Sequence, residues 1–116
     1  MPGNQATSSI FARRLKQARL GSDLTQEQLG IHAGIDEFSA SARINQYERG
    51  KHIPHLAMGQ RLARVLHVPT SFLYEEDDLL AALLITAARL TRGKKKILLA
   101  NAETLTQSTS TTRKTK

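Results

Sequence analysis

The sequence contains no cysteine and no tryptophan, and only three of its 116 residues are proline. Without cysteine, neither a disulfide nor a thiolate zinc site can form, and the chain is compatible with a reducing cell interior. The longest uncharged apolar run, residues 79–88, is far too short to span a bilayer. Residues 1–9 lack the apolar segment of a signal peptide. These absences predict a soluble, cytoplasmic chain without membrane contact, which forms one domain around a modest core.

Catalytic and metal-binding patterns are also missing. No set of serine, lysine and carboxylate residues has a catalytic arrangement, so the sequence predicts neither an enzyme nor a cofactor. The four histidines, at positions 32, 52, 55 and 67, are scattered and lack nearby cysteine or carboxylate ligands, which argues against a metal site. The acidic run at residues 75–78 lacks the spacing of a calcium-binding loop. It suits a helix N-terminus, where negative charge meets the positive end of the dipole.

Positive charge is abundant and unevenly distributed. The formal net charge is +7 and the isoelectric point is about 10.3, which is typical of a chain with a polyanionic partner such as nucleic acid. Residues 1–70 carry +4, residues 71–91 carry −3 and residues 92–116 carry +6. A DNA contact is therefore expected in the first segment or in the tail.

Apolar residues recur at helical spacing and no strand pattern is present, so the sequence predicts an all-α fold. One helix is expected from a cap at Ser8 or Ser9 to Gly21, and further helices over residues 26–33, 39–48 and 55–66, followed by a helical turn around Phe72. Thr25 and Gln28 fit a capping box at the start of the second helix.

Two more helices are expected after residue 74. The first follows the acidic run and is rich in leucine, and the second begins at a Thr91 cap and extends to Leu105. Residues 1–7 and the Thr/Ser-rich, basic residues 106–116 are expected to be disordered. The predicted division is therefore a domain over residues 8–74 and a short C-terminal helical extension over residues 75–105.

The most informative stretch is residues 24–54, where short elements follow one another in a fixed order. These are Leu24-Thr25-Gln26, Leu29-Gly30, Gly34, Ile44, Tyr47-Glu48, Arg49-Gly50-Lys51 and Pro54. Further along the chain stand Leu62-Ala63, Leu66, Val68-Pro69 and Phe72-Leu73. Together these elements resemble the Xre-like family of helix-turn-helix domains, which includes Cro and the phage repressors, over residues 9–74. The resemblance implies a five-helix, lambda-repressor-like fold and a transcriptional regulator that binds double-stranded DNA.

The resemblance places the helix around residues 39–48 in the DNA major groove. If Ile44 and Tyr47 face the core, the residues that project outward are Ser41, Ala42, Arg43, Asn45 and Gln46. Arg43 can bind guanine through two hydrogen bonds, and Asn45 or Gln46 can pair with adenine.

Other residues are expected to position the domain rather than to read sequence. Gln26, Arg49 and Lys51 are expected to contact phosphates, which set the register on DNA. By resemblance, Glu48 forms a partly buried ion pair with Arg19, which would hold the third helix against the first.

The sequence departs from the family between Gly34 and Ile44, where nine residues stand. This is several more than the family's usual spacing. We expect the insert at residues 36–40 to lengthen the turn and the start of the third helix. Its two acidic groups would repel phosphate unless they cap that helix.

Several functional alternatives stay open at the sequence level. A bacterial or phage-encoded repressor could bind a palindromic operator as a homodimer, with the helix from Leu79 as a candidate dimer contact. Activation is equally compatible with the sequence. The chain could instead be the antitoxin of a toxin–antitoxin pair, holding a protein partner through its C-terminal helices, or a protein-interaction module that keeps the fold without binding DNA.

Overall fold

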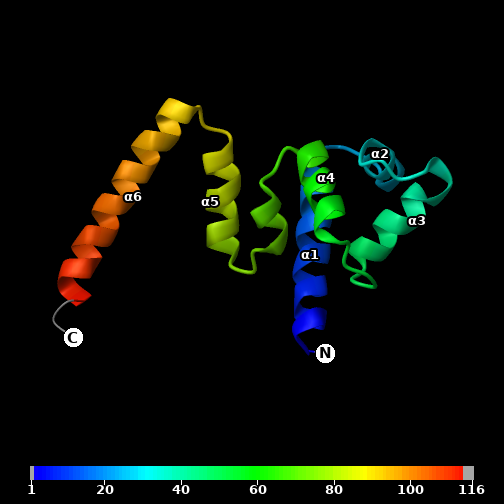
Figure 1. Cartoon of the computed structure of the whole chain (residues 1–116), viewed down its shortest axis with the longest axis horizontal. Coiled ribbons are helices and arrows are strands. Elements are labelled where there is room, and N and C mark those ends of the chain that lie inside the picture. The colour runs from blue at the N-terminus through cyan, green and yellow to red at the C-terminus, as the bar shows by residue number, and fades with distance from the viewer. Residues whose placement is uncertain (1, 114–116) are drawn as a thin grey trace. The chain divides into compact units, whose positions relative to one another are not determined.

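The computed structural model describes the backbone of residues 2–113 and the side chains of residues 7–107, and all regular structure within them is helical (Figure 1). The chain divides into two compact units, Met1–Ile85 and Thr86–Lys116. The elements, in chain order, are α1 (Pro2–Gly21), α2 (Gln26–His32), α3 (Glu37–Glu48), α4 (Leu56–Leu66), the 3-10 helix η1 (Thr70–Tyr74), α5 (Asp78–Ala88) and α6 (Arg92–Arg113).

The all-α prediction is confirmed, but several helix bounds differ from those expected. Helix α1 begins at Pro2 rather than at Ser8 or Ser9, because proline is well suited to a first helical position, where its missing N–H is not needed. Helix α6 continues to Arg113, and residues 106–113 contain no glycine or proline to end it. The bounds of α1 and α6 thus include residues 2–7 and 106–113 of the two segments for which disorder was expected, while Met1 and residues 114–116 lie outside the described part. The last of the five helices expected before residue 75 is a 3-10 helix.

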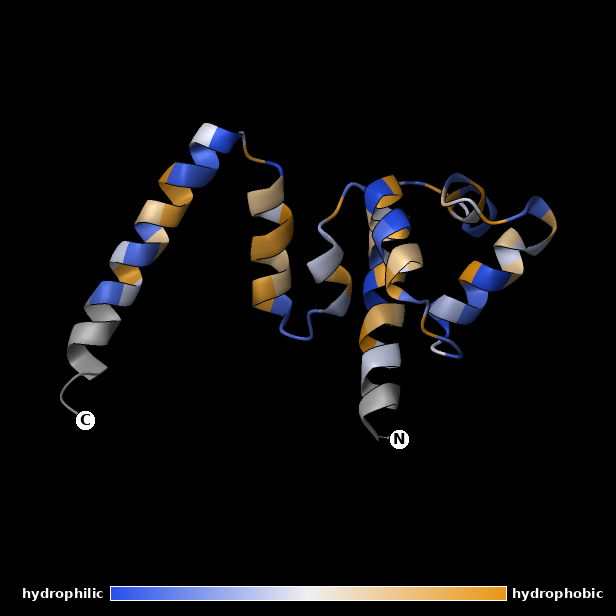
Figure 2. Cartoon of the chain, viewed as in Figure 1, coloured by the Kyte–Doolittle hydropathy of each residue, from blue (hydrophilic) through white to orange (hydrophobic). Residues whose placement is uncertain are grey.

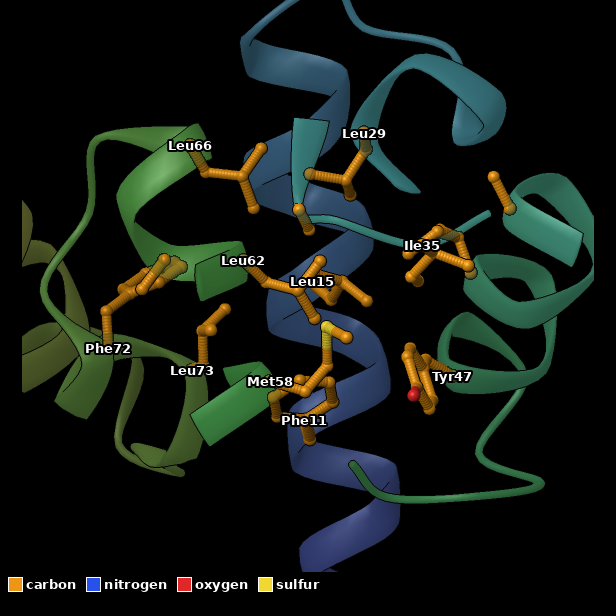
Figure 3. Packing of buried hydrophobic residues seen from close by; sticks show 14 of the residues in the cluster. Phe11, Leu15, Leu29, Ile35, Tyr47, Met58, Leu62, Leu66, Phe72 and Leu73 are labelled. Carbon is orange, nitrogen blue, oxygen red and sulfur yellow. The ribbon is translucent and has the colours of Figure 1, made fainter. Parts of the chain in front are cut away.

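The hydrophobic core of the first unit forms around α1. Figure 3 shows Leu15 of α1 beside Leu62 of α4, with Phe72 and Leu73 on one side and Tyr47 of α3 on the other. Burying an apolar side chain of this size stabilises a fold by about 1.5–3 kcal/mol. The largest fully buried side chains come from all five elements of residues 2–74: Phe11, Phe72, Leu15, Leu29, Ile44, Leu62 and Leu73.

Helices α2 and α3 cross so closely at Gly30 that this position has no room for a side chain. A Cβ atom at Gly30 would lie 2.7 Å from the Cβ of Ala40 and 3.0 Å from its Cα and its carbonyl oxygen. The turn between the helices passes through Gly34, whose φ of 92° is readily adopted only by glycine. Arg61 of α4 donates through Nε to the Ala33 carbonyl at 2.9 Å, which places a cation at the C-terminal end of α2.

Buried Arg14 joins α1 to the start of α5. Its side chain is 3% exposed, and it donates to the Glu75 carbonyl at 2.8 Å and to Asp78 Oδ1 at 2.9 Å. Asp77 caps α5, since its Oδ1 accepts hydrogen bonds from the amides of Leu79 and Leu80. The acidic run therefore does start a helix, and it also binds an arginine.

Helices α5 and α6 carry seven of the twelve exposed large hydrophobic residues of the described chain. Helix α5 is the most hydrophobic in Figure 2, and its residues Leu79, Leu80 and Leu83 are exposed while Ala81 is buried. In α6 every side chain from Arg92 to Gln107 is exposed. Within the described residues, no helix has the length and apolar character needed to cross a membrane.

Candidate nucleic-acid interface

Helix α3 has one face in the core and the other in solvent. Ala40, Ile44 and Tyr47 recur at helical spacing and are buried. Tyr47 meets Phe11 of α1 edge to face, with the ring centroids 6.4 Å apart. The exposed residues of the helix include four that the sequence analysis singled out, Ser41, Ala42, Arg43 and Gln46.

An ion pair fixes the C-terminal end of α3 against α1. Arg19 Nε lies 2.5 Å from Glu48 Oε2, and the Glu48 side chain is only 3% exposed. The second nitrogen contact, Nη2 to Oε1, is 3.0 Å, so the arginine holds both carboxylate oxygens. The hydrogen bond to Glu48 raises the pKa of Arg19, opposed by partial burial. The pair implied by the family resemblance is therefore present.

The same arginine also anchors the segment that leads into α2. Arg19 Nη1 donates to the Leu24 carbonyl at 2.9 Å. The next residue, Thr25, forms the predicted capping box, since its Oγ1 accepts from the Gln28 amide and Gln28 Oε1 accepts from the Thr25 amide. The start of α2 and the end of α3 are thus fixed by one side chain of α1.

Gln26 and Asn45 lie differently from what the sequence suggested. Gln26 Nε2 donates to Asn45 Oδ1 at 3.2 Å and to Glu48 Oε1 at 3.1 Å, which uses both of its amide hydrogens inside the chain. A phosphate contact through this amide would have to break one of these bonds. Asn45 is half-buried beside α2 rather than projecting freely. Sequence spacing could not show this, because the crossing of α2 and α3 brings the two amides together.

The insert at residues 36–40 extends α3 rather than the turn alone. Asp36 stands at the N-cap position, Glu37 is in the first turn, and Ser39 Oγ donates to Asp36 Oδ2 at 3.0 Å. Both acidic groups therefore lie at the positive end of the helix dipole. The extension exposes Phe38, a residue that the sequence analysis did not select.

Arg49 and Lys51 follow α3 in an exposed turn. Arg49 is the C-cap residue, and the Lys51 amide donates to the Gln46 carbonyl at 2.9 Å across Gly50, whose φ is 73°. Both side chains are exposed, as phosphate contacts require. Arg61, which holds the end of α2, was also missed by the sequence analysis, because only the fold brings it to Ala33.

A family model described as a helix-turn-helix domain matches residues 10–71, which is more than half of the chain. The chain belongs to the helix-turn-helix domain family. A solved structure, the crystal structure of transcriptional regulator BswR, is 45% identical to this chain and superposes with a TM-score of 0.79. The alignment covers 84% of this chain and 96% of that chain. No curated protein matches the sequence.

Membership of the helix-turn-helix family indicates which helix of the domain would face DNA. In helix-turn-helix domains the second helix of the motif is the one that enters the major groove, with its N-terminal residues at the base edges. In this domain that helix is α3, and its exposed face is the candidate nucleic-acid interface.

Proposed function

We propose that the chain is a sequence-specific transcriptional regulator of the Xre and Cro type, a repressor that binds a palindromic operator as a dimer. The observation that carries the proposal is the division of α3 into two faces. One face and the C-terminal end are held by the core and by the Arg19–Glu48 pair. The other face is exposed over Ser41, Ala42 and Gln46, as expected for a rigid helix that reads bases.

The four exposed residues of α3 that the sequence analysis singled out each have a role in this proposal. Arg43 donates two hydrogen bonds to guanine, and Gln46 pairs with adenine. The small side chains of Ser41 and Ala42 let the helix approach the base edges closely. Arg49 and Lys51 bind phosphates, which strengthens binding at low salt without selecting a sequence.

The helix-turn-helix domain of residues 8–74 would bind DNA, and the extension of residues 75–105 would hold a second copy. Leu79, Leu80 and Leu83 are exposed on α5 and are the candidate dimer contact. A symmetric dimer presents two copies of α3 about 34 Å apart, one turn of DNA. Such a cytoplasmic protein represses a gene by occupying its promoter.

Selection of bound duplexes from a random DNA pool tests the proposal. The wild-type chain is expected to enrich a palindromic site, and Arg43→Ala is expected to lose the preference for guanine at one position in each half-site. Arg89→Ala removes the same charge from an exposed position outside α3 and should enrich the wild-type site. Failure of the wild-type chain to enrich any site would contradict the proposal.

An antitoxin is the second candidate, and the exposed apolar residues of α6 favour it. Ile97, Leu99 and Leu105 are each more than half exposed, which is unusual for a helix that serves no interface. An antitoxin would bind its operator and a small toxin protein together. Co-purification of one small protein from the native host, lost in Leu99→Asp but kept in Arg43→Ala, would favour this function over simple repression.

A further inference from the structure

We propose that Phe38 is a specificity-determining residue, which contacts the 5-methyl group of a thymine in the major groove. The inference rests on the proposed DNA-binding function and adds a contact that the helix-turn-helix pattern does not supply. It comes from the insert at residues 36–40, which forms an additional first turn of α3 and carries the phenylalanine.

The exposure of Phe38 is the first observation. Its side chain is 92% exposed, the highest value among the exposed large hydrophobic residues of the described chain. A single exposed apolar residue is ordinary on a protein surface. Phe38 differs because it lies on α3, the helix proposed to enter the major groove, and this position gives the side chain a function.

Phe38 lies on the side of α3 that faces away from the core. Counting four and eleven residues onward gives Ala42 and Arg49, which are both exposed and share one stripe of a helix with 3.6 residues per turn. Asn45, seven residues onward, lies on the same stripe but is half-buried beside α2. Ala42 is exposed and small, and the buried residues of α3 lie on the opposite side. The side that carries Phe38 is therefore the side that would enter the groove.

The chemistry of the major groove leaves one partner for a phenyl ring. Base edges there present hydrogen-bond donors and acceptors, except for the thymine 5-methyl group, which is apolar. A phenyl ring cannot bind phosphate, so a role in backbone contact is excluded by its chemistry. Packing the ring against the methyl group removes apolar surface of both partners from water.

The position within α3 predicts which base is read. Phe38 lies one helical turn before Ala42, about 6 Å along the helix axis. The thymine is therefore expected beside the base edges that Ala42 approaches, toward the N-terminal end of α3. The insert thus lengthens the site that one copy of the domain reads.

Replacement of single thymines by deoxyuridine in the selected duplex tests the contact, because it removes only the methyl group. We expect one thymine in each half-site whose replacement weakens binding by the wild-type chain about fourfold, the effect of losing one buried methyl group. Phe38→Ala should bind both duplexes equally, and Phe38→Leu should keep part of the discrimination. Circular dichroism and melting should be the same for all three proteins, because the side chain is exposed.

The outcomes separate this inference from the proposed function. Site-specific binding without any methyl-sensitive thymine, or an equal loss on deoxyuridine for wild type and Phe38→Ala, overturns the role of Phe38 and leaves the regulator intact. A change of oligomeric state in Phe38→Ala, with an unchanged selected site, also overturns it and assigns the ring to a protein contact. Absence of any specific binding by the wild-type chain overturns both proposals.

Discussion

Helices α3 and α6 both present exposed side chains, but only in α3 does a packed opposite face define the direction in which the exposed side chains point. In α3 a packed face of Ala40, Ile44 and Tyr47 fixes the orientation, so the opposite face is defined. In α6 the side chains from Arg92 to Gln107 are exposed on all sides. An exposed residue is therefore informative where the rest of its element is anchored. The following variants test this difference by making matched changes in the packed part of the chain that contains α3 and in α6.

The largest expected effect is loss of the buried carboxylate at the end of α3. Glu48→Ala leaves Arg19 without its carboxylate partner and is expected to lower the free energy of unfolding by about 3–5 kcal/mol. Glu103→Ala removes an exposed carboxylate from α6 and should change it by less than about 0.5 kcal/mol. Urea unfolding followed by circular dichroism measures both. Equal effects would show that the ion pair does not hold α3.

Glycine-to-alanine changes in the two units should have opposite signs. Gly30→Ala places a Cβ 2.7 Å from that of Ala40 and is expected to destabilise the fold by about 1–3 kcal/mol. Gly93→Ala on α6 meets no atom within 4 Å and should be neutral or stabilising by up to about 1 kcal/mol. Melting temperatures of the two variants suffice for the comparison. A Gly30→Ala protein as stable as the wild type would mean that α2 and α3 do not cross so closely.

A smaller effect is expected in the acid stability of the seam between α1 and α5. Two hydrogen bonds lower the pKa of the Asp78 carboxyl below its ordinary value of 3.8. The bond from Arg13 has the larger effect and the bond from Arg14 the smaller one. A carboxylate with a depressed folded-state pKa adds stability that is complete above its unfolded pKa and is lost as pH falls through the folded value. Asp78→Asn should therefore be less stable than wild type near neutral pH, with the difference closing below pH 3.8. The free energy of unfolding of both proteins, measured from neutral pH to below pH 3.8, checks this prediction.

A matched variant in α6 controls for that pH series. Glu103→Gln removes a carboxylate without touching either arginine of α1, and its stability should follow the wild-type profile. A wild-type profile for Asp78→Asn as well would mean that the exposed carboxylate is screened by solvent and adds nothing to stability.

The sequence predicted the elements whose signals are local. The Thr25–Gln28 capping box and the Thr91 cap of α6 are both present, since each depends on a few adjacent residues. The family pattern also led to the Arg19–Glu48 pair, which local reasoning alone would have missed. The division of the chain into functional domains stays a prediction.

The features that the sequence did not predict depend on contacts between distant segments. Gln26 and Asn45 are nineteen residues apart and meet only because α2 crosses α3. Arg14 reaches Asp78 over sixty-four residues of chain. The insert at residues 36–40 was expected to lengthen the start of the third helix, and α3 does begin earlier than residue 39, at Glu37, but the sequence did not show which of the added residues would face outward. Exposure of Phe38 then follows from the register of those residues.

The most direct test of the account is the affinity of three proteins for the selected duplex and for a scrambled duplex of the same composition, at one salt concentration. We predict that Arg43→Ala lowers the ratio of the two affinities by about 5- to 150-fold, corresponding to about 1–3 kcal/mol of base discrimination. Lys95→Ala on α6 should leave the ratio unchanged. Equal losses on both duplexes in Arg43→Ala would contradict the account, because α3 would then bind the DNA backbone without reading its sequence.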